Sequence, residues 1–123
     1  MVLSVTSFGY KYGVPTEADL VFDARFLPNP NFVPTLKPLT GGDAPVVRYM
    51  NRQKQTAAFL KKLDQFLSYV IPRYIEEGKS YLTIGIGCTG GRHRSVMIAN
   101  AVAAALAGKG YSVRVRHRDV RQE

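Results

Sequence analysis

Residues 80–107 have the sequence SYLTIGIGCTGGRHRSVMIANAVAAALA, in which a β-branched apolar run leads into glycines and then into an alanine-rich segment. This pattern predicts a buried strand over residues 80–88, a tight turn over 89–94 and a helix over 96–107. The Ser95 hydroxyl is expected to cap the helix, and Gly108 and Gly110 to end it. A strand–turn–helix unit of this kind is typical of α/β proteins.

The segments on either side of this unit extend the same architecture. Further strands are predicted over 2–8, 18–25 and 112–117, and a long amphipathic helix over 51–77. The nearly continuous apolar run in 18–25 indicates a strand that is covered on both faces. We therefore expect an α/β fold with one domain, residues 1–123, and a largely parallel sheet flanked by helices.

Residues 26–45 contain five prolines and are expected to form an irregular loop. Long loops in compact domains usually carry a function or are disordered. Phe26, Leu27 and Phe32 predict that this loop packs on the body of the domain.

Composition narrows the class of protein. The chain of 123 residues is 46% hydrophobic and 21% charged, which excludes a disordered protein. Its single cysteine excludes a disulfide scaffold, and nothing resembles a signal peptide or a membrane span. We expect a cytoplasmic protein that uses no metal and no cofactor.

The turn after the 80–88 strand has the chemistry of an anion site. Glycines allow close backbone approach, and a helix N-terminus favours negative charge. Arginine adds charge-assisted donors, and histidine and hydroxyl groups add further polar contacts. The alternative is a plain turn that needs glycine, but it leaves the polar side chains unexplained. The candidate phosphate-binding residues are Thr89, Gly90, Gly91, Arg92, His93, Arg94 and Ser95.

The same residues allow an enzymatic alternative. Cys88, Arg94 and Ser95 have the Cys-x5-Arg-Ser spacing of cysteine-dependent phosphatases, in which the thiolate attacks phosphorus. Asp23, Asp43 and Asp119 are the candidate acids that such chemistry requires. The simpler interpretation is that Cys88 is a small buried residue at a strand end. No Gly-x4-Gly-Lys-Ser/Thr motif is present, so hydrolysis of the P-loop type has no support.

Two other segments are candidates for binding. Asp23 and Asn29 follow a predicted strand and could meet a sugar or phosphate group at the same sheet edge, or simply shape the loop. The chain carries a formal charge of +8, which favours an anionic partner such as nucleic acid. Its last strand either contacts RNA or is an edge charged against aggregation. The candidate RNA-binding residues are Arg114, Arg116, His117 and Arg118.

Four motifs together resemble one family, the C-terminal domain of RapZ, the bacterial RNase adapter protein. They are SFGYKYGVP at 7–15, ADLVFDARFLPNP at 18–30, GIGCTGGRHRS at 85–95 and RHR at 116–118. The resemblance implies a fold similar to a phosphofructokinase sub-domain. It also implies a regulatory domain, not an enzyme, that senses glucosamine-6-phosphate, binds small regulatory RNA and forms homo-oligomers.

Under this resemblance the sugar-phosphate pocket corresponds to residues 89–91 and 93–95, with Asp23 and Asn29 beside it, and the RNA-binding tail to Arg114 and 116–118. Three features depart from the family. Its P-loop kinase-like domain is absent from the sequence, so the chain is expected to be an excised or a stand-alone domain without nucleotide binding. Arg92 stands where relatives often have Lys or Gln, and Asn31 where they often have His.

Overall fold

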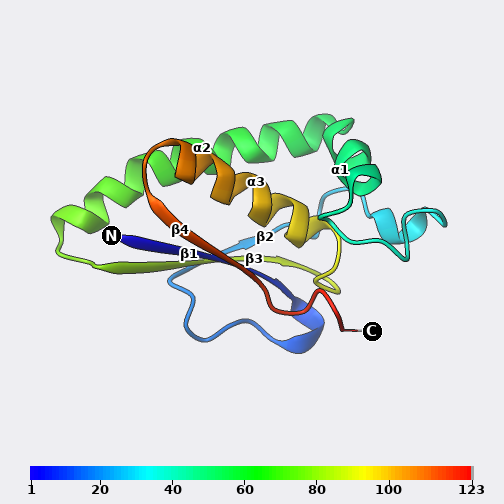
Figure 1. Ribbon diagram of the computed structural model, residues 1–123, viewed down its shortest axis with the longest axis horizontal. Coiled ribbons are helices and arrows are strands. Elements are labelled where there is room, and N and C mark those ends of the chain that lie inside the picture. The colour runs from blue at the N-terminus through cyan, green and yellow to red at the C-terminus, as the bar shows by residue number, and fades with distance from the viewer. Residues whose placement is uncertain (123) are drawn as a thin grey trace.

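The computed structural model describes residues 1–122 and has a single parallel sheet with three α-helices on one of its faces (Figure 1). The α/β fold expected from the sequence is confirmed. The sheet has the order β2-β3-β1-β4. Its strands are β1 (Val2–Gly9), β2 (Leu20–Asp23), β3 (Tyr81–Cys88) and β4 (Ser112–His117). The helices are α1 (Ala44–Asn51), α2 (Lys54–Glu76) and α3 (Arg94–Gly108).

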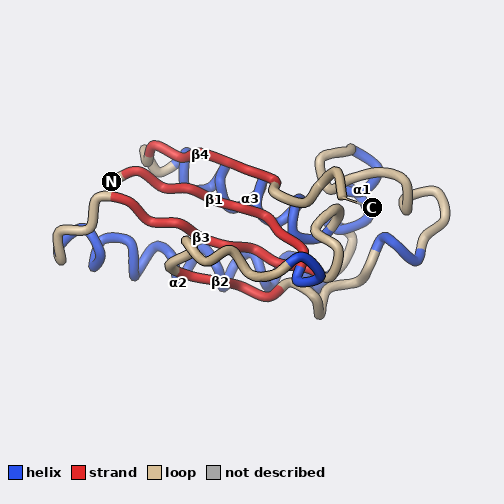
Figure 2. The backbone as a smooth tube through the Cα atoms, turned by 90° about the horizontal axis from the view of Figure 1, so that it is seen from below, coloured by secondary structure: helices blue, strands red, loops and turns tan. Residues whose placement is uncertain are grey.

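All four strands end at one edge of the sheet because they run parallel. Gly9 pairs with Cys88, and Asp23 with Gly87, so the last residues of three strands lie side by side. On the other side Ser7 pairs with His117 at the end of β4. Figure 2 shows the sheet from its uncovered side, crossed only by the connection from β1 to β2. Ligands of such sheets bind beyond the carboxyl ends of the strands.

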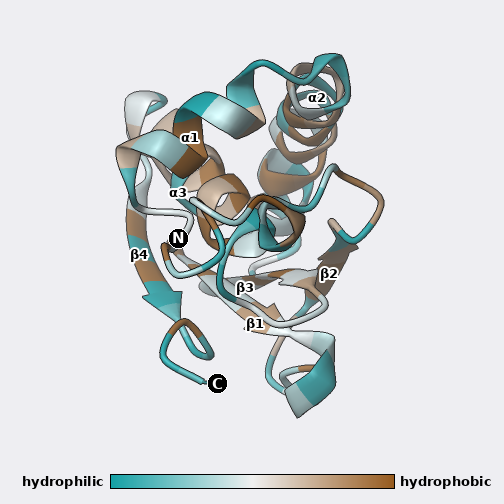
Figure 3. Cartoon of the chain, turned by 90° about the vertical axis from the view of Figure 1, so that its right-hand side faces the viewer, coloured by the Kyte–Doolittle hydropathy of each residue, from teal (hydrophilic) through white to brown (hydrophobic). Residues whose placement is uncertain are grey.

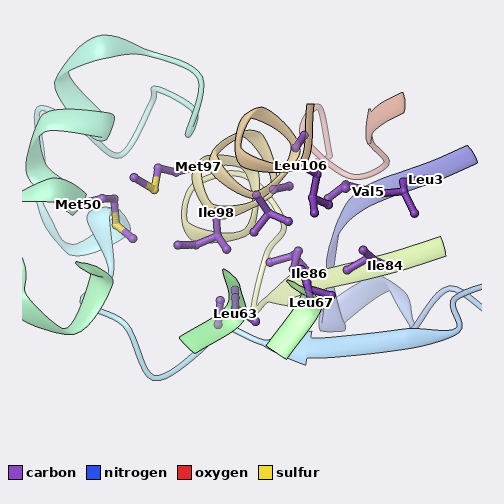
Figure 4. Close-up of a cluster of buried hydrophobic side chains, with 14 of the residues drawn as sticks. Leu3, Val5, Met50, Leu63, Leu67, Ile84, Ile86, Met97, Ile98 and Leu106 are labelled. Atoms are coloured by element: carbon purple, nitrogen blue, oxygen red, sulfur yellow. The ribbon is translucent and has the colours of Figure 1, made fainter. Parts of the chain in front are cut away.

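The hydrophobic core lies between the sheet and the helices. Ile84 and Ile86 of β3 are fully buried, and Leu67 of α2 and Ile98 of α3 close over them (Figure 4). Complete burial of a side chain of this size stabilises the fold by about 1.5–3 kcal/mol. Apolar residues therefore fill almost the whole of α3, which Figure 3 shows mainly in brown. This packing fixes the direction of α3 and hence the position of its N-terminus.

The prediction of one helix over 51–77 is wrong at its start. The helix α2 begins three residues later than predicted, at Lys54, and a separate helix that was not predicted, α1, precedes it. The chain bends between the two helices because Gln53 has an extended backbone, with φ −86° and ψ 126°. The bend lets Val46 and Met50 of α1 reach the core with no exposed surface. Pro45 belongs to the segment 26–45 that was expected to form an irregular loop. It instead occupies the first turn of α1, where proline is favoured because an N–H group at this position would have no partner within the helix.

The prediction of a strand over 18–25 that is covered on both faces is wrong in its length and in its burial. Only Leu20–Asp23 pair, at the edge of the sheet, and Val21 is 40% exposed, so one face of this strand is open to solvent. In the 26–45 loop, Leu27 is buried as expected, whereas Phe32 is 81% exposed and does not pack. Within residues 1–122, no helix combines the length and the apolar character needed to cross a membrane.

Candidate anion-binding site

The turn between β3 and α3 is pressed against the end of β1. Gly91 has φ +81°, a conformation that side chains other than glycine rarely adopt. A Cβ atom there would lie 2.6 Å from the Gly9 nitrogen and 2.9 Å from the Asp119 Cβ. The Gly9 N–H donates to Asp119 Oδ2 at 2.8 Å, which fastens the end of β1 to the segment after β4. The turn is thus held in place by two other strand ends.

Arg94, the first residue of α3, is only 4% exposed. Its Nη1 donates to the carbonyl oxygens of Arg25 at 2.6 Å and Leu27 at 3.1 Å, and its Nη2 to Thr89 Oγ1 at 3.4 Å. Its Nε has no hydrogen-bond partner. No ion pair among residues 1–122 includes Arg94. A buried guanidinium that lacks a carboxylate is unfavourable unless another anion approaches it.

Ser95 does not cap α3, which corrects the prediction made from the sequence. It is fully buried as the second residue of the helix, and no side chain caps the helix N-terminus. Its Oγ instead lies 3.2 Å from the Cys88 Sγ. The same sulfur accepts a hydrogen bond from the Gly91 N–H at 3.3 Å. Strand end, turn and helix start are therefore joined through one thiol.

His93 is buried and anchors the proline-rich loop to the turn. Its Nε2 lies 3.2 Å from the Leu36 carbonyl oxygen. Burial lowers the pKa of His93 below its ordinary value of 6.5 and outweighs the opposing effect of the hydrogen bond to the Leu36 carbonyl. The Arg92 charge lowers this pKa further, to a smaller extent. The imidazole is thus neutral at pH 7 and acts as a hydrogen-bond donor to the loop. The Gly41 N–H reinforces this joint by donating to the Arg92 carbonyl at 2.8 Å.

These elements enclose a cavity of ≈ 360 Å³ at the carboxyl edge of the sheet, the edge onto which Figure 3 looks. Four cationic side chains line it, and among residues 1–122 no carboxylate does. It contains six of the residues predicted from the sequence, namely Asn29, Thr89, Gly90, Arg92, His93 and Arg94. Gly91 and Ser95 support the cavity from behind, and neither lines it. Cys88, the nucleophile of the enzymatic alternative, lies in its wall.

Sequence reasoning missed part of this lining. Lys11 follows β1, Lys37 belongs to the proline-rich loop, and Tyr12 and Gln122 complete the wall. Asn31 lines the cavity too, at the position beside the pocket where relatives often have His. Lys11 could have been found, because it directly follows a predicted strand whose carboxyl end must lie beside that of β3. Lys37 had no such signal, since its position depends on how His93 holds the loop.

Asp23 does not line the cavity. Arg25, two residues further along, forms a bidentate ion pair with it, in which the shortest N–O distance is 2.6 Å. Hydrogen bonds from the Arg25 side chain hold the pKa of Asp23 below its ordinary value, and the charge of Arg94 contributes to a lesser extent. Arg25 also stacks on the Tyr10 ring at 3.8 Å. The Asp23 carboxylate thus forms an ion pair with Arg25 and does not face the cavity.

The predicted RNA-binding residues separate into two groups. Arg114 and Arg116 are exposed and line a shallow hollow with Ser4, Thr6 and Thr83 on the face of the sheet away from the helices. The ring of His117 lies on the opposite face, 2.7 Å from Ser7 Oγ and 2.9 Å from Asn100 Oδ1. Arg118 is engaged as well, because it pairs with Asp119 and donates to the Gly13 carbonyl. Of the four predicted residues, Arg114 and Arg116 are thus the two cations that line this hollow, and Glu17 lines it as well.

Fold and site together define an α/β domain with a cationic cavity at the carboxyl edge of a parallel sheet. The chain belongs to the family of RapZ C-terminal domains, which it matches over residues 1–121. Membership of this family supports a regulatory domain of the RapZ type.

Three relatives illustrate the match, and each is described as a nucleotide-binding protein. The chain is 57% identical to that of Acidobacterium capsulatum over 98% of its length, covering 39% of the relative. It is 54% identical to that of Caldanaerobacter subterraneus subsp. tengcongensis over 100% of its length, and 56% identical to that of Brevibacillus brevis over 98%. These alignments cover 43% and 41% of the two relatives. The chain therefore spans about two-fifths of the curated relatives it matches.

Proposed function

We propose that this chain is a regulatory domain that binds a phosphorylated sugar, glucosamine-6-phosphate, in the cavity at the β3–α3 turn. The buried Arg94 carries this proposal, because its charge has no carboxylate partner and its Nε has no hydrogen-bond partner. A phosphate at the start of α3 would supply the missing negative charge and hydrogen-bond acceptors for the Arg94 guanidinium. The N-terminus of a helix also favours a bound anion. The sugar would contact the amides of Asn29 and Asn31, which offer donors and acceptors to hydroxyl and amino groups.

Calorimetric titration of the domain tests the ligand class. Glucosamine-6-phosphate is expected to bind, inorganic phosphate to bind more weakly, and glucosamine not to bind, because Arg94 and the helix terminus recognise the phosphoryl group. Equal heats for glucosamine and its phosphate would contradict the assignment of the phosphate to this turn. No heat from any of the three would contradict the sugar-phosphate proposal altogether.

We further propose that the ligand is bound without chemical conversion. A phosphatase of the cysteine type needs a protonated acid for the leaving group. Asp23 is paired with Arg25, and Asp43 accepts the Thr40 N–H at 2.8 Å. Burial acts to raise the pKa of Asp119, but its bonds from Arg118 and the Gly9 N–H outweigh this effect and hold it below its ordinary value. Phosphate release from glucosamine-6-phosphate that disappears in Cys88→Ser would establish the enzymatic alternative instead.

RNA is the second proposed partner, bound at the surface formed by Arg114 and Arg116. Their two exposed positive charges exceed the single negative charge of Glu17 in the same hollow, and within a formal charge of +8 they support contact with a phosphate backbone. We also propose that the domain acts in the cytoplasm and that it forms a homo-oligomer, as the family resemblance implies.

The salt dependence of RNA binding measures this contact. Each lost phosphate contact on a single strand reduces the slope of log K against log salt by about 0.7. Replacing Arg114 and Arg116 together by alanine should therefore flatten the slope by about 1.4, twice that single-contact value. Lys61→Ala with Lys62→Ala, on the exposed face of α2, removes the same charge elsewhere and serves as the control. If the slope changed equally in the two double variants, the effect would come from the net charge of the chain. This result would contradict an RNA interface at β4.

A further inference from the structure

Cys88 is the only cysteine of the chain and lies at the end of β3. It is 2% exposed, and it lies in the wall of the cationic cavity. Its sulfur accepts the Gly91 N–H at 3.3 Å and lies 3.2 Å from Ser95 Oγ. A structural cysteine in apolar surroundings has no such contacts, so the position of this thiol requires another explanation.

Cationic side chains line the same cavity as the sulfur. The N-terminus of α3 begins six residues after it, at Arg94, and Arg92 and Arg94 share the cavity with it. The unpartnered Nε of the buried Arg94 is an independent sign that this site receives an anionic group. Cysteines that react in proteins lie in electropositive sites of this kind, because the thiolate is the reacting form.

We propose that Cys88 is a site of reversible oxidation by hydrogen peroxide, placed where the oxidised sulfur blocks the anion site. The thiolate attacks one peroxide oxygen, so an S–O bond forms and the O–O bond breaks. The sulfur loses two electrons, and the departing hydroxide takes up a proton to become water. The product is a sulfenic acid. Hydrogen peroxide is small enough for the cavity, whereas bulky oxidants would not reach a thiol that is 2% exposed.

The reverse reaction needs thiols from solution. The chain has no second cysteine to form an internal disulfide. A small thiol would condense with the sulfenic acid to give a mixed disulfide and water, and a second small thiol would release Cys88 as the free thiol. The added oxygen occupies the space in front of Arg94, so the oxidised domain should not bind phosphate until it is reduced.

The decisive measurement is the rate at which the full chain acquires a sulfenic acid. After catalase removes the peroxide, the chain is unfolded in urea, so that dimedone reaches every sulfenic acid, and the labelled product is followed by the mass of the intact protein. The folded chain should react at least ten times faster with hydrogen peroxide than the chain unfolded in urea, and dithiothreitol should reverse the change before trapping. Cys88→Ser should not be labelled. A folded rate equal to or below the unfolded rate would overturn the proposal, because Cys88 would then be an inert buried thiol.

Two further experiments distinguish the oxidation of Cys88 from the proposed binding of a phosphorylated ligand. Ser95→Ala removes the hydroxyl beside the sulfur and should slow labelling several-fold, whereas Ser112→Ala at the exposed start of β4 should not. Equal rates in both variants would contradict the role of the site. Saturating inorganic phosphate should protect wild-type Cys88. Rapid labelling without protection would support oxidation and contradict anion binding at the turn, whereas an inert thiol in a chain that binds phosphate would overturn oxidation alone.

Discussion

Replacing Arg94 by alanine should weaken phosphate binding by about 100-fold or more. A hydrogen bond to a charged group contributes about 1.5–3 kcal/mol, and each 1.4 kcal/mol changes affinity roughly tenfold. A guanidinium can form two such bonds with one phosphoryl group. The same variant should also lower the melting temperature, because Arg94 holds the carbonyl oxygens of Arg25 and Leu27. Calorimetric titration with circular dichroism melting measures both effects.

Arg94→Lys separates charge from geometry. Lysine keeps the positive charge but cannot present two parallel N–H groups, so binding should still fall by about tenfold. Arg48→Ala, an exposed arginine of α1, removes the same charge far from the turn and should leave affinity within about twofold. If Arg94→Lys binds phosphate as tightly as the unchanged chain, Arg94 serves the fold and not the ligand.

The position of the site could be predicted from sequence because parallel strands end together. The glycine turn follows β3, and its two neighbours β1 and β2 end at Gly9 and Asp23, so their following residues had to meet at one edge. The hydrogen-bond partner of each side chain could not be predicted in this way. Asp23 had the right location for a ligand contact, but Arg25 occupies it through a bond between residues only two positions apart.

Helix boundaries were harder to predict because tertiary packing decides them. The apolar spacing from Phe59 onward correctly indicated α2, whereas α1 depends on the burial of Val46 and Met50 between α2, α3 and the loop. Ser95 illustrates the same limit at the site. Its hydroxyl has the chemistry of a cap, but the helix starts at Arg94, two residues before the predicted start, and the buried Cys88 sulfur becomes the neighbour of Ser95.

The contact of Asp119 with Gly9 and Gly91 connects the two proposed binding regions, the cavity and the surface of β4. Asp119 follows β4, accepts the Gly9 N–H and pairs with Arg118, while Gly91 packs against its Cβ. The turn that lines the cavity and the strand that carries Arg116 therefore share one buried contact. Any substitution that opens this contact should affect fold and cavity together, and Gly91 is the position where the geometry is tightest.

Gly91→Ala is accordingly expected to destabilise the domain by roughly 3 kcal/mol or more, and to lower its Tm by roughly 10 °C or more. The added methyl group would lie 2.6 Å from the Gly9 nitrogen and 2.9 Å from the Phe8 carbonyl carbon, and backbone atoms cannot move aside without parting β1 from the turn. The φ of +81° adds strain for any side chain. Urea unfolding followed by circular dichroism gives the difference.

Gly90→Ala is the matched control, one residue away in the same turn. A Cβ atom at this position meets nothing within 4 Å, and its φ lies outside the left-handed region, so stability should change by less than about 1 kcal/mol. Gly90 lines the cavity, however, and the new methyl group would take space next to the bound phosphate. The pair should therefore separate the two roles of the turn, with Gly91→Ala losing the fold and Gly90→Ala keeping the fold but losing affinity. Equal stability of the two variants would contradict the close contact between the turn, β1 and Asp119 on which the site depends.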